Sequence, residues 1–288
     1  MKFCGHDVLI QSDLSSLSAL TLITKARNAT FANLDTICSL LCDPITKAHL
    51  KLQDKMLVND HGTIYPIVEG IPMLFPCDIE SVRKILQTEG LQAFRQLNPV
   101  EQYCTFAILK ASGENNLDYS NIWYERHLYR ATQMLKDATG RFLDVGCDNI
   151  YISRGMLAAD VDYVGLEPSQ GPSPEFRISG LGEFLPFADA SFDSVSFQTS
   201  LDHVFDYQLA LAEAHRVLKP KGRLYISTLL WLEDAQIYTD TVHFHHFRSA
   251  GLEAALQGFQ VDKVNCYVWK DNKHRFSAYL SGVKINGQ

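Results

Sequence analysis

The chain has few of the features that would attach it to a membrane or cross-link it. Its seven cysteines are an odd number without paired spacing, which we interpret as the reduced thiols of a cytoplasmic protein. No apolar run approaches the roughly 20 residues that span a bilayer. The N-terminus also lacks the basic and apolar regions of a signal peptide. We therefore expect a cytoplasmic protein that does not enter a membrane.

The chain also lacks an excess of positive charge. It has 26 Lys and Arg against 33 Asp and Glu, which gives a net charge of −7. An acidic chain is a poor match for a polyanion, so nucleic acid is less favoured as a partner than a small molecule. Hydrophobic residues make up 46% and charged residues 20%, a balance that argues against disorder. The length allows one large domain or two modest ones.

The sequence is organised around residues 141–157, RFLDVGCDNIYISRGML. An apolar run ends at Gly146 and a helical pattern follows, so we expect a strand, a tight turn and a helix. Glycine lets the backbone of the turn approach a ligand, and the first N–H groups of a helix are free donors. The next apolar run ends at Glu167, about 20 residues on, where an acid can accept hydrogen bonds from both ribose hydroxyls of a nucleoside.

Five segments resemble, in order, the signature of class I S-adenosylmethionine-dependent methyltransferases: LDVGC, VGLEP, GEFLPFADASFDSV, SLDHVFDY and EAHRVLKPKGRLYIS. The resemblance covers roughly residues 141–282 and is most specific at 185–227. It implies an α/β fold with a Rossmann-like, seven-stranded sheet, mostly parallel with an antiparallel final strand. It also implies S-adenosyl-L-methionine as the cofactor. The chain departs from the signature at Asp148, Asn149 and Ile150, where the family has Gly-x-Gly.

The resemblance assigns cofactor roles to residues at the carboxyl ends of the strands, where such sheets bind ligands. Glu167 would hold the ribose, Asp144 would anchor the turn, and the turn would pass the methionine moiety. Leu181 stands where relatives have an acid that addresses the adenine, so Glu183 could substitute for it. The expected cofactor-binding residues are Asp144, Gly146, Cys147, Asp148, Glu167, Pro168, Leu181, Gly182, Glu183, Gln198 and Thr199.

Three histidines are the candidate catalytic bases. His203 follows the expected fourth strand and could orient a substrate or take a proton near neutral pH. It could instead be a structural ring beside the cofactor, which we favour. His243 and His245 lie in the HFHHF segment and share a face if that segment is a strand. We expect them to face the substrate and to hold no metal, because no carboxylate partner is clear.

Residues 1–35 are an extension without an assigned role, in which a helix capped by Ser12 or Asp13 is one possibility. Residues 36–76 carry turn signals between short β-like runs. Their LLCDP and YPIVEGIPMLFP segments resemble the small zinc-ribbon-like module of the Trm112 type, which precedes some methyltransferases. We therefore expect a β-rich, ribbon-like module here.

The zinc ligands of that module are incomplete in this chain. In zinc-bearing relatives two Cys-x-x-Cys pairs bind the metal, whereas Cys42 is followed here by residues that cannot complete its pair. The set Cys38, Cys42, Asp60 and His61 could still be tetrahedral. We expect a metal-free module, because structural zinc favours four thiolate or imidazole ligands.

Residues 77–139 have helical spacing and form the expected linker and lid. Tyr119 and Trp123 are the candidate substrate-binding residues, because helices ahead of the first strand often cover the cofactor cleft in the family. The methyltransferase domain would be 140–288. Within it, only a short segment with two prolines follows Pro168 before the third strand. We expect a short second crossover or a rudimentary third strand there, and hence a more open nucleoside pocket.

The sequence therefore predicts an S-adenosylmethionine-dependent methyltransferase that acts on an oxygen or nitrogen of a small molecule, such as a sugar or secondary metabolite. Three alternatives stay open. Trm112-like modules accompany some RNA methyltransferases. Asp148 adds like charge where the methionine carboxylate should lie, which would suit a non-catalytic, cofactor-binding pseudo-methyltransferase. A Rossmann-type NAD enzyme is disfavoured by the RVLKPKG block and the broken glycine fingerprint. The oligomeric state is not predicted.

Overall fold

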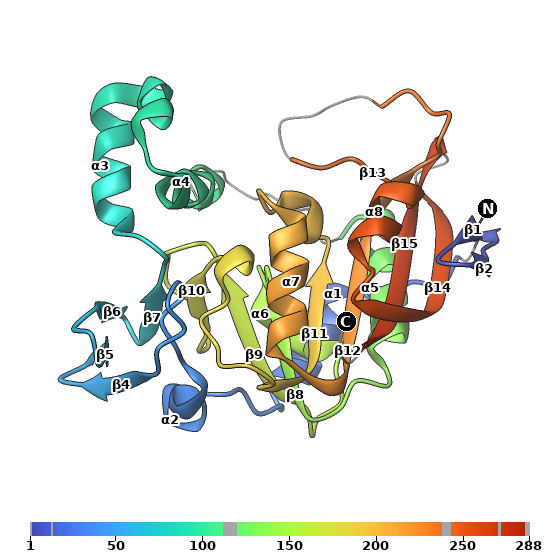
Figure 1. Ribbon diagram of the computed structural model, residues 1–288. Coiled ribbons are helices and arrows are strands. Elements are labelled where there is room, and N and C mark those ends of the chain that lie inside the picture. Colours follow the sequence, from blue (N-terminus) through green and yellow to red (C-terminus); the bar gives the residue numbers. More distant parts are fainter. Residues whose placement is uncertain (1, 13, 112–119, 238–242, 270–271, 286–288) are drawn as a thin grey trace.

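The structure is a computed structural model that describes residues 2–12, 14–111, 120–237, 243–269 and 272–285. Its centre is a mixed sheet with helices on both faces (Figure 1). The helices are α1 (Ala19–Ala26), α2 (Leu34–Ile37), α3 (Ile79–Glu89), α4 (Pro99–Ala111), α5 (Ile122–Leu135), α6 (Ile150–Gly155), α7 (Tyr207–Val217) and α8 (Ser249–Ala255). Short 3₁₀ turns are η1 (Cys38–Leu40), η2 (Gly90–Gln96), η3 (Gly182–Phe184) and η4 (Leu201–His203). No described helix is both long and apolar enough to cross a bilayer.

Seven strands form the Rossmann-like sheet that the sequence predicts. Their order is β14, β15, β12, β11, β8, β9 and β10. Neighbouring strands are parallel except for β15, which runs antiparallel to β12 and to β14. The mostly parallel sheet with an antiparallel final strand is therefore confirmed. The strands are β8 (Arg141–Val145), β9 (Asp162–Glu167), β10 (Ile178–Gly180), β11 (Phe192–Gln198), β12 (Leu218–Trp231), β14 (Phe259–Trp269) and β15 (Asn272–Lys284).

The central strands are apolar on both sides because helices cover both faces of the sheet. Successive strand residues point to opposite faces. In β8, Phe142 packs into the cluster of α1, α5 and α6, whereas Leu143 packs into the cluster of α7 and α8. Helix α1 crosses α6 so closely that a Cβ on Gly155 would lie 2.2 Å from the carbonyl oxygen of Leu22. This packing fixes α6, and with it the turn after β8.

Side chains cap the N-termini of α7 and α1. Asp206 caps α7, since its Oδ1 accepts hydrogen bonds from the backbone N–H groups of Gln208 and Leu209, both at 3.0 Å. Helix α1 begins at Ala19 and is capped by Ser18, so the predicted cap at Ser12 is wrong. The alternative cap, Asp13, lies outside the described residues.

The region 36–76 is a meander of four antiparallel strands: β4 (Leu50–Gln53), β5 (Met56–Asn59), β6 (Ile64–Val68) and β7 (Ile71–Leu74). It extends the central sheet, because β7 pairs in parallel with β10. Two backbone hydrogen bonds join the region to the loop before β11, from Cys42 N to Pro186 O and from Ala188 N to Leu40 O. The division between 36–76 and 140–288 stays a prediction, although sheet and core run through both.

The opposite edge of the sheet is extended by the N-terminal segment. There β3 (Ile10–Gln11) pairs with β14, next to the small hairpin of β1 (Lys2–Phe3) and β2 (His6–Asp7). A further short strand, β13 (Phe247–Arg248), pairs with the end of β12. Both edges of the seven-stranded core are thus covered.

The four candidate zinc ligands do not gather within the part of the chain that the structure describes. The carboxylate of exposed Asp60 pairs with Lys51 Nζ at 2.7 Å. Burial raises the pKa of the Cys42 thiol to about 11, so without a metal ion this thiol is protonated.

The second crossover is a short loop and the third strand is rudimentary, so both predicted departures are found. Strand β9 ends at Glu167, β10 has only three residues, and the segment between them is not helical. The loop is nevertheless held in place. Arg177 Nη2 donates to Gly171 O at 2.9 Å, and Ser179 Oγ donates to Ser169 O at 2.7 Å. Together with β7, these bonds limit the opening that the sequence predicts.

Candidate functional site

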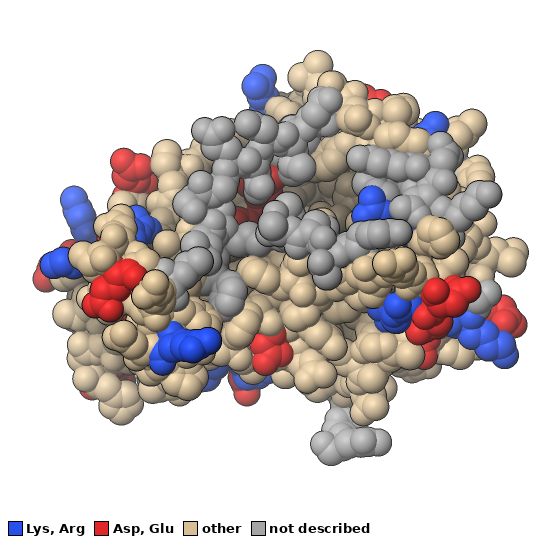
Figure 2. Space-filling view, turned by 90° about the horizontal axis from the view of Figure 1, so that it is seen from above, with Lys and Arg blue, Asp and Glu red and all other residues tan. Residues whose placement is uncertain are grey.

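A cavity of about 740 Å³ lies at the carboxyl ends of the parallel strands. This end of the molecule is the hollowed face in Figure 2. Most residues predicted for the site line the cavity: Trp123, Gly146, Cys147, Asp148, Glu167, Pro168, Leu181, Gly182, Glu183, Gln198, Thr199, His203 and His243. Asp144 and His245 do not line it, and Tyr119 lies outside the described residues.

The turn after β8 requires glycine at its first position. Gly146 has φ +78°, and a Cβ there would lie 2.5 Å from the Cβ of Ser200. The backbone N–H groups of Gly146 and Cys147 donate to Leu166 O at 2.8 and 3.2 Å. These two donors therefore tie the turn to β9, which differs from the expectation that backbone donors of this turn face a ligand.

Asp144 lies beneath the cavity and holds the strand ends together. It is fully buried and accepts hydrogen bonds from Ser196 Oγ at 2.6 Å and from the Tyr163 hydroxyl at 3.0 Å. The amide of Gln198 is a third, longer contact at 3.4 Å. Burial raises the pKa of Asp144 while these hydrogen bonds oppose the rise. The predicted anchoring role fits this position, whereas direct contact with a ligand does not.

Glu167 ends β9 at the wall of the cavity. Its Oε2 accepts a hydrogen bond from the backbone N–H of Asp148 at 3.0 Å, which links the tips of β8 and β9. Burial raises the pKa of Glu167, and the Asp148 N–H opposes the rise. Asp148 itself is exposed and has φ +36°, in the left-handed region. The Asp148 carboxylate therefore projects from the turn at a position where the methyltransferase family that the sequence resembles has glycine.

The part of the cavity that the sequence predicts to hold the adenine is formed around η3. Leu181 lines the cavity, and a Cβ on Gly182 would lie 3.0 Å from Val145 Cγ1. Glu183 is buried, and its Oε1 accepts hydrogen bonds from the backbone N–H groups of Phe205 and Asp206 at 2.7 and 3.2 Å. Burial raises the pKa of Glu183. This side chain thus holds the loop before α7, and its contact with adenine stays a prediction.

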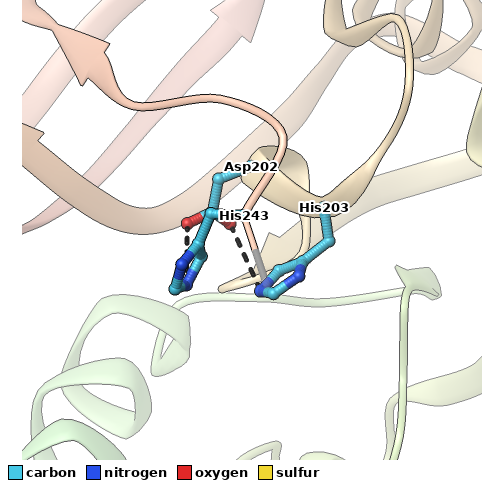
Figure 3. A group of neighbouring side chains, drawn as sticks. All are labelled: Asp202, His203 and His243. Atoms are coloured by element: carbon cyan, nitrogen blue, oxygen red, sulfur yellow. Dashed lines mark ion pairs between the residues drawn. The ribbon is translucent and has the colours of Figure 1, made fainter. Parts of the chain in front are cut away.

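Asp202 places two of the candidate bases at the cavity. It belongs to η4, directly after β11, and its two carboxylate oxygens face different rings (Figure 3). His203 Nε2 lies 4.0 Å from Oδ1 and His243 Nε2 lies 3.9 Å from Oδ2. The carbonyl oxygen of Asp202 also accepts hydrogen bonds from Phe244 N and His245 N at 2.9 and 3.2 Å, which hold the His243 segment against η4.

The same three side chains are the only group of metal-ligand type that gathers among the described residues. Their nearest ligand atoms lie within 4.8 Å of one another. Around a tetrahedral zinc with Zn–N distances of about 2.1 Å, ligand atoms lie roughly 3.4 Å apart. The side chains would therefore have to move together to hold an ion, whereas their present spacing allows a carboxylate to act on two imidazoles.

His245 differs from the other two candidate bases. Its Nε2 lies 3.2 Å from Phe205 O, and its ring packs on Tyr207 and Phe247 with centroid distances of 4.8 and 5.8 Å. The structure thus places this imidazole among aromatic side chains outside the cavity lining, and we do not propose it as a base.

The far wall of the cavity is formed by α5 and β15. His127 Nδ1 lies 2.9 Å from the Tyr279 hydroxyl. Burial, and secondarily the charge of Arg130, lowers the pKa of His127 to about 4, so this imidazole is neutral at physiological pH. Arg275 and Ser277 precede Tyr279 on the same strand face.

Sequence reasoning missed Asp202 and the wall formed by β15. The signal for Asp202 was its place directly before His203 in a segment that follows an expected strand. The signal for β15 was a polar side chain at every second position, Arg275, Ser277 and Tyr279, within an otherwise apolar run. Such alternation indicates one polar face, but it does not indicate a cavity.

The middle of the chain is similar to methyltransferases. Residues 143–226 match the family described as Methyltransferase domain, and all predicted cofactor-binding residues fall in this range. A Mycobacterium tuberculosis protein named "Probable S-adenosylmethionine-dependent methyltransferase" is 31% identical over 135 residues, which cover 42% of this chain and 49% of that protein. A demethylmenaquinone methyltransferase of Corynebacterium glutamicum is 39% identical over 83 residues, 29% and 30% of the two chains. The chain thus spans half or less of the curated relatives it matches.

The 1,6-didemethyltoxoflavin-N1-methyltransferase of Burkholderia thailandensis is 14% identical, with a TM-score of 0.48 and coverage of 82% of this chain and 98% of that chain.

Proposed function

We propose that the protein is an S-adenosylmethionine-dependent methyltransferase that methylates an oxygen or nitrogen of a small molecule. The observation that carries this proposal is Glu167 at the tip of β9, beside the Gly146 turn and at the wall of a large cavity. Both residues lie in the segment that matches the Methyltransferase domain family. The cavity volume of about 740 Å³ is in the range of sites that enclose small ligands.

The residues present suit this cofactor. When bound, S-adenosylmethionine supplies a methyl group that its sulfonium has already activated. Glu167 would accept hydrogen bonds from the ribose hydroxyls. Four carboxylates line the cavity, which favours a ligand that carries a positive charge. They are Asp148, Glu167, Glu183 and Asp202.

The acceptor would lose its proton to an imidazole. His203 and His243 both line the cavity, and Asp202 lies beside each of them. These separations are longer than hydrogen bonds, as catalytic contacts often are before a substrate binds. The three residues therefore provide a base for a hydroxyl or amine acceptor, and the remaining requirement is to hold that atom in line with the methyl group.

A small acceptor is favoured over RNA by the surface of the cavity end. On the described part of this face, Lys and Arg are scattered among Asp and Glu rather than gathered into a basic stripe (Figure 2). Polyanion binding needs such a stripe. Relatives named for quinone methylation agree with a small acceptor.

Calorimetric titration with S-adenosylmethionine and with S-adenosylhomocysteine is the first test. We expect micromolar binding of both, with one site per chain. Absence of binding at millimolar ligand would contradict the proposal. A second step incubates the protein with isotopically labelled S-adenosylmethionine and, separately, a metabolite extract and an RNA fraction. Label in small molecules supports the proposal, whereas label only in RNA would replace the small-molecule acceptor with RNA.

The pseudo-methyltransferase alternative is tested at Asp148. Replacing it with asparagine removes the charge and keeps a residue that tolerates positive φ. We expect Asp148→Asn to strengthen S-adenosylmethionine binding about fivefold, as for one pair of unit charges near water. Decarboxylated S-adenosylmethionine is the control, because it lacks the repelled carboxylate and its affinity should not rise. If wild-type binding is absent and Asp148→Asn restores it, the natural chain has lost the cofactor.

A further inference from the structure

Arg275 is a cation at the cavity that has no anionic partner among the described residues. It is the only arginine or lysine among the described residues that line the cavity. Its guanidinium lies 5.5 Å from the ring centroid of Trp231, and its buried Nε has no hydrogen-bond partner. Among the described residues, no carboxylate forms an ion pair with it. A partly desolvated guanidinium costs free energy unless an anion meets it.

The position of Arg275 assigns it to the acceptor half of the cavity. Strand β15 is four strands from β9 in the sheet, since β12, β11 and β8 lie between them. At about 4.8 Å per strand, roughly 19 Å separate Arg275 from the ribose-binding position at Glu167. Arg275 pairs with Trp231 across the ladder and shares a strand face with Tyr279. It therefore lies beyond the cofactor rather than against it.

Two hydroxyls on the Arg275 face of the β12–β15 ladder line the same cavity. Ser227 of β12 and Ser277 of β15 are 1% and 4% exposed, and among the described residues neither hydroxyl has a hydrogen-bond partner. Buried hydroxyls without partners are rare in folded proteins. Since each can donate a hydrogen bond, the two hydroxyls and the guanidinium together offer several donors to a ligand rich in oxygen.

We infer that the acceptor carries a carboxylate or phosphate group that Arg275 binds, with Ser227 and Ser277 binding further oxygens of the same molecule. This inference rests on the proposed function, because it concerns the acceptor half of that cavity. It separates charge along the cavity: Asp148, Glu167 and Glu183 lie toward the cofactor, and Arg275, the one lining guanidinium among the described residues, lies at the other end. An anionic group would orient the acceptor so that its reacting atom points to Asp202 and the two imidazoles.

The test uses matched pairs of compounds on the protein saturated with S-adenosylhomocysteine. The pairs are 4-hydroxybenzoate with 4-hydroxybenzamide and phenyl phosphate with phenol, titrated by calorimetry. We expect the anion of at least one pair to bind tenfold or more tightly than its neutral partner. Which anion binds better distinguishes carboxylate from phosphate. Equal binding, or no binding of either anion at 20 mM, would overturn the inference.

Variants assign the preference to the residue. Arg275→Gln should remove the difference within each pair and leave S-adenosylhomocysteine affinity unchanged, and Arg275→Lys should keep part of the difference. Arg126→Gln is the matched control, because Arg126 also covers a tryptophan, at 4.7 Å from the Trp123 ring, but does not line the cavity. It should keep the full preference. If S-adenosylhomocysteine itself does not bind, the proposed function fails; if it binds and the anion preference is absent, only this inference fails.

Discussion

Replacing Glu167 with alanine should lower the affinity for S-adenosylmethionine by roughly 10-fold to 150-fold. The charge-assisted hydrogen bonds that the two ribose hydroxyls share with this carboxylate should be worth about 1.5–3 kcal/mol together. The alanine variant also removes the acceptor of the hydrogen bond from the Asp148 N–H. Its loss of affinity therefore includes both the missing ribose contact and a less restrained turn. Calorimetric titration of the variant and the wild type measures the two effects together.

Glu167→Gln separates the two contributions. Glutamine keeps a carbonyl oxygen for the Asp148 N–H, so the turn is preserved and only the charge at the ribose is lost. We expect this variant to lose most of the affinity that the alanine variant loses. The control is Glu175→Gln, which removes a carboxylate that accepts a hydrogen bond from the Tyr151 hydroxyl. If this variant loses as much cofactor affinity as Glu167→Gln, the loss is a general effect of charge. Unchanged affinity in Glu167→Ala would remove the central assignment of the site.

The buried carboxylate of Glu167 should lower the free energy of unfolding at neutral pH. Burial raises the pKa of Glu167 above its usual value, so the folded state binds a proton more strongly than the unfolded state. The free energy of unfolding therefore falls as pH rises through the unfolded pKa toward the folded one, and the loss persists at neutral pH. Glu167→Gln should thus bind the cofactor less well and yet unfold at a higher temperature at neutral pH.

The fold and the cofactor half of the site could be predicted because their signals are local. An apolar run, a turn glycine and an acid at the next strand tip are each readable within a few residues, and parallel strands bring these tips to one edge. The N-cap Asp206 is also local. The α1 start was placed wrongly because Ser12 and Ser18 are equivalent caps in sequence, and only packing of α1 on Gly155 selects the second.

The acceptor half could not be predicted because it depends on contacts between distant segments. On the cofactor side, the pairing of β7 with β10 also joins residues about a hundred positions apart, and short strands give no signal for their partner. His243 reaches Asp202 only because backbone hydrogen bonds hold its segment on η4. Arg275 belongs to a hairpin strand whose alternation shows a polar face but not what that face meets. Sequence periodicity thus predicts helices and strands, whereas the residues that line the site depend on which of these elements pack together.

Replacing Asp202 with asparagine should lower kcat by about 100-fold to 1,000-fold, within the range that acid–base catalysis contributes. The change removes the charge that both imidazoles face, at 4.0 and 3.9 Å, and keeps the shape of the side chain. S-adenosylhomocysteine affinity should stay the same, because Asp202 acts on the acceptor. The measurement is methyl transfer to the acceptor that labelling identifies. A change in cofactor affinity equal to the loss in rate would contradict the assigned role.

Substitution of the histidines shows which one takes the proton. If His243 is the base, His243→Asn should lower kcat as much as Asp202→Asn does. The double variant should lower it little further, because residues that act as a unit are not additive. The same comparison applies to His203→Asn. His245→Asn is the matched control, since this ring lies among Tyr207 and Phe247 outside the cavity lining, and its kcat should be unchanged.

A metal chelator tests whether Asp202, His203 and His243 bind an ion instead. Loss of activity in EDTA that zinc or magnesium restores would show that they do, and the proton would then need another acceptor.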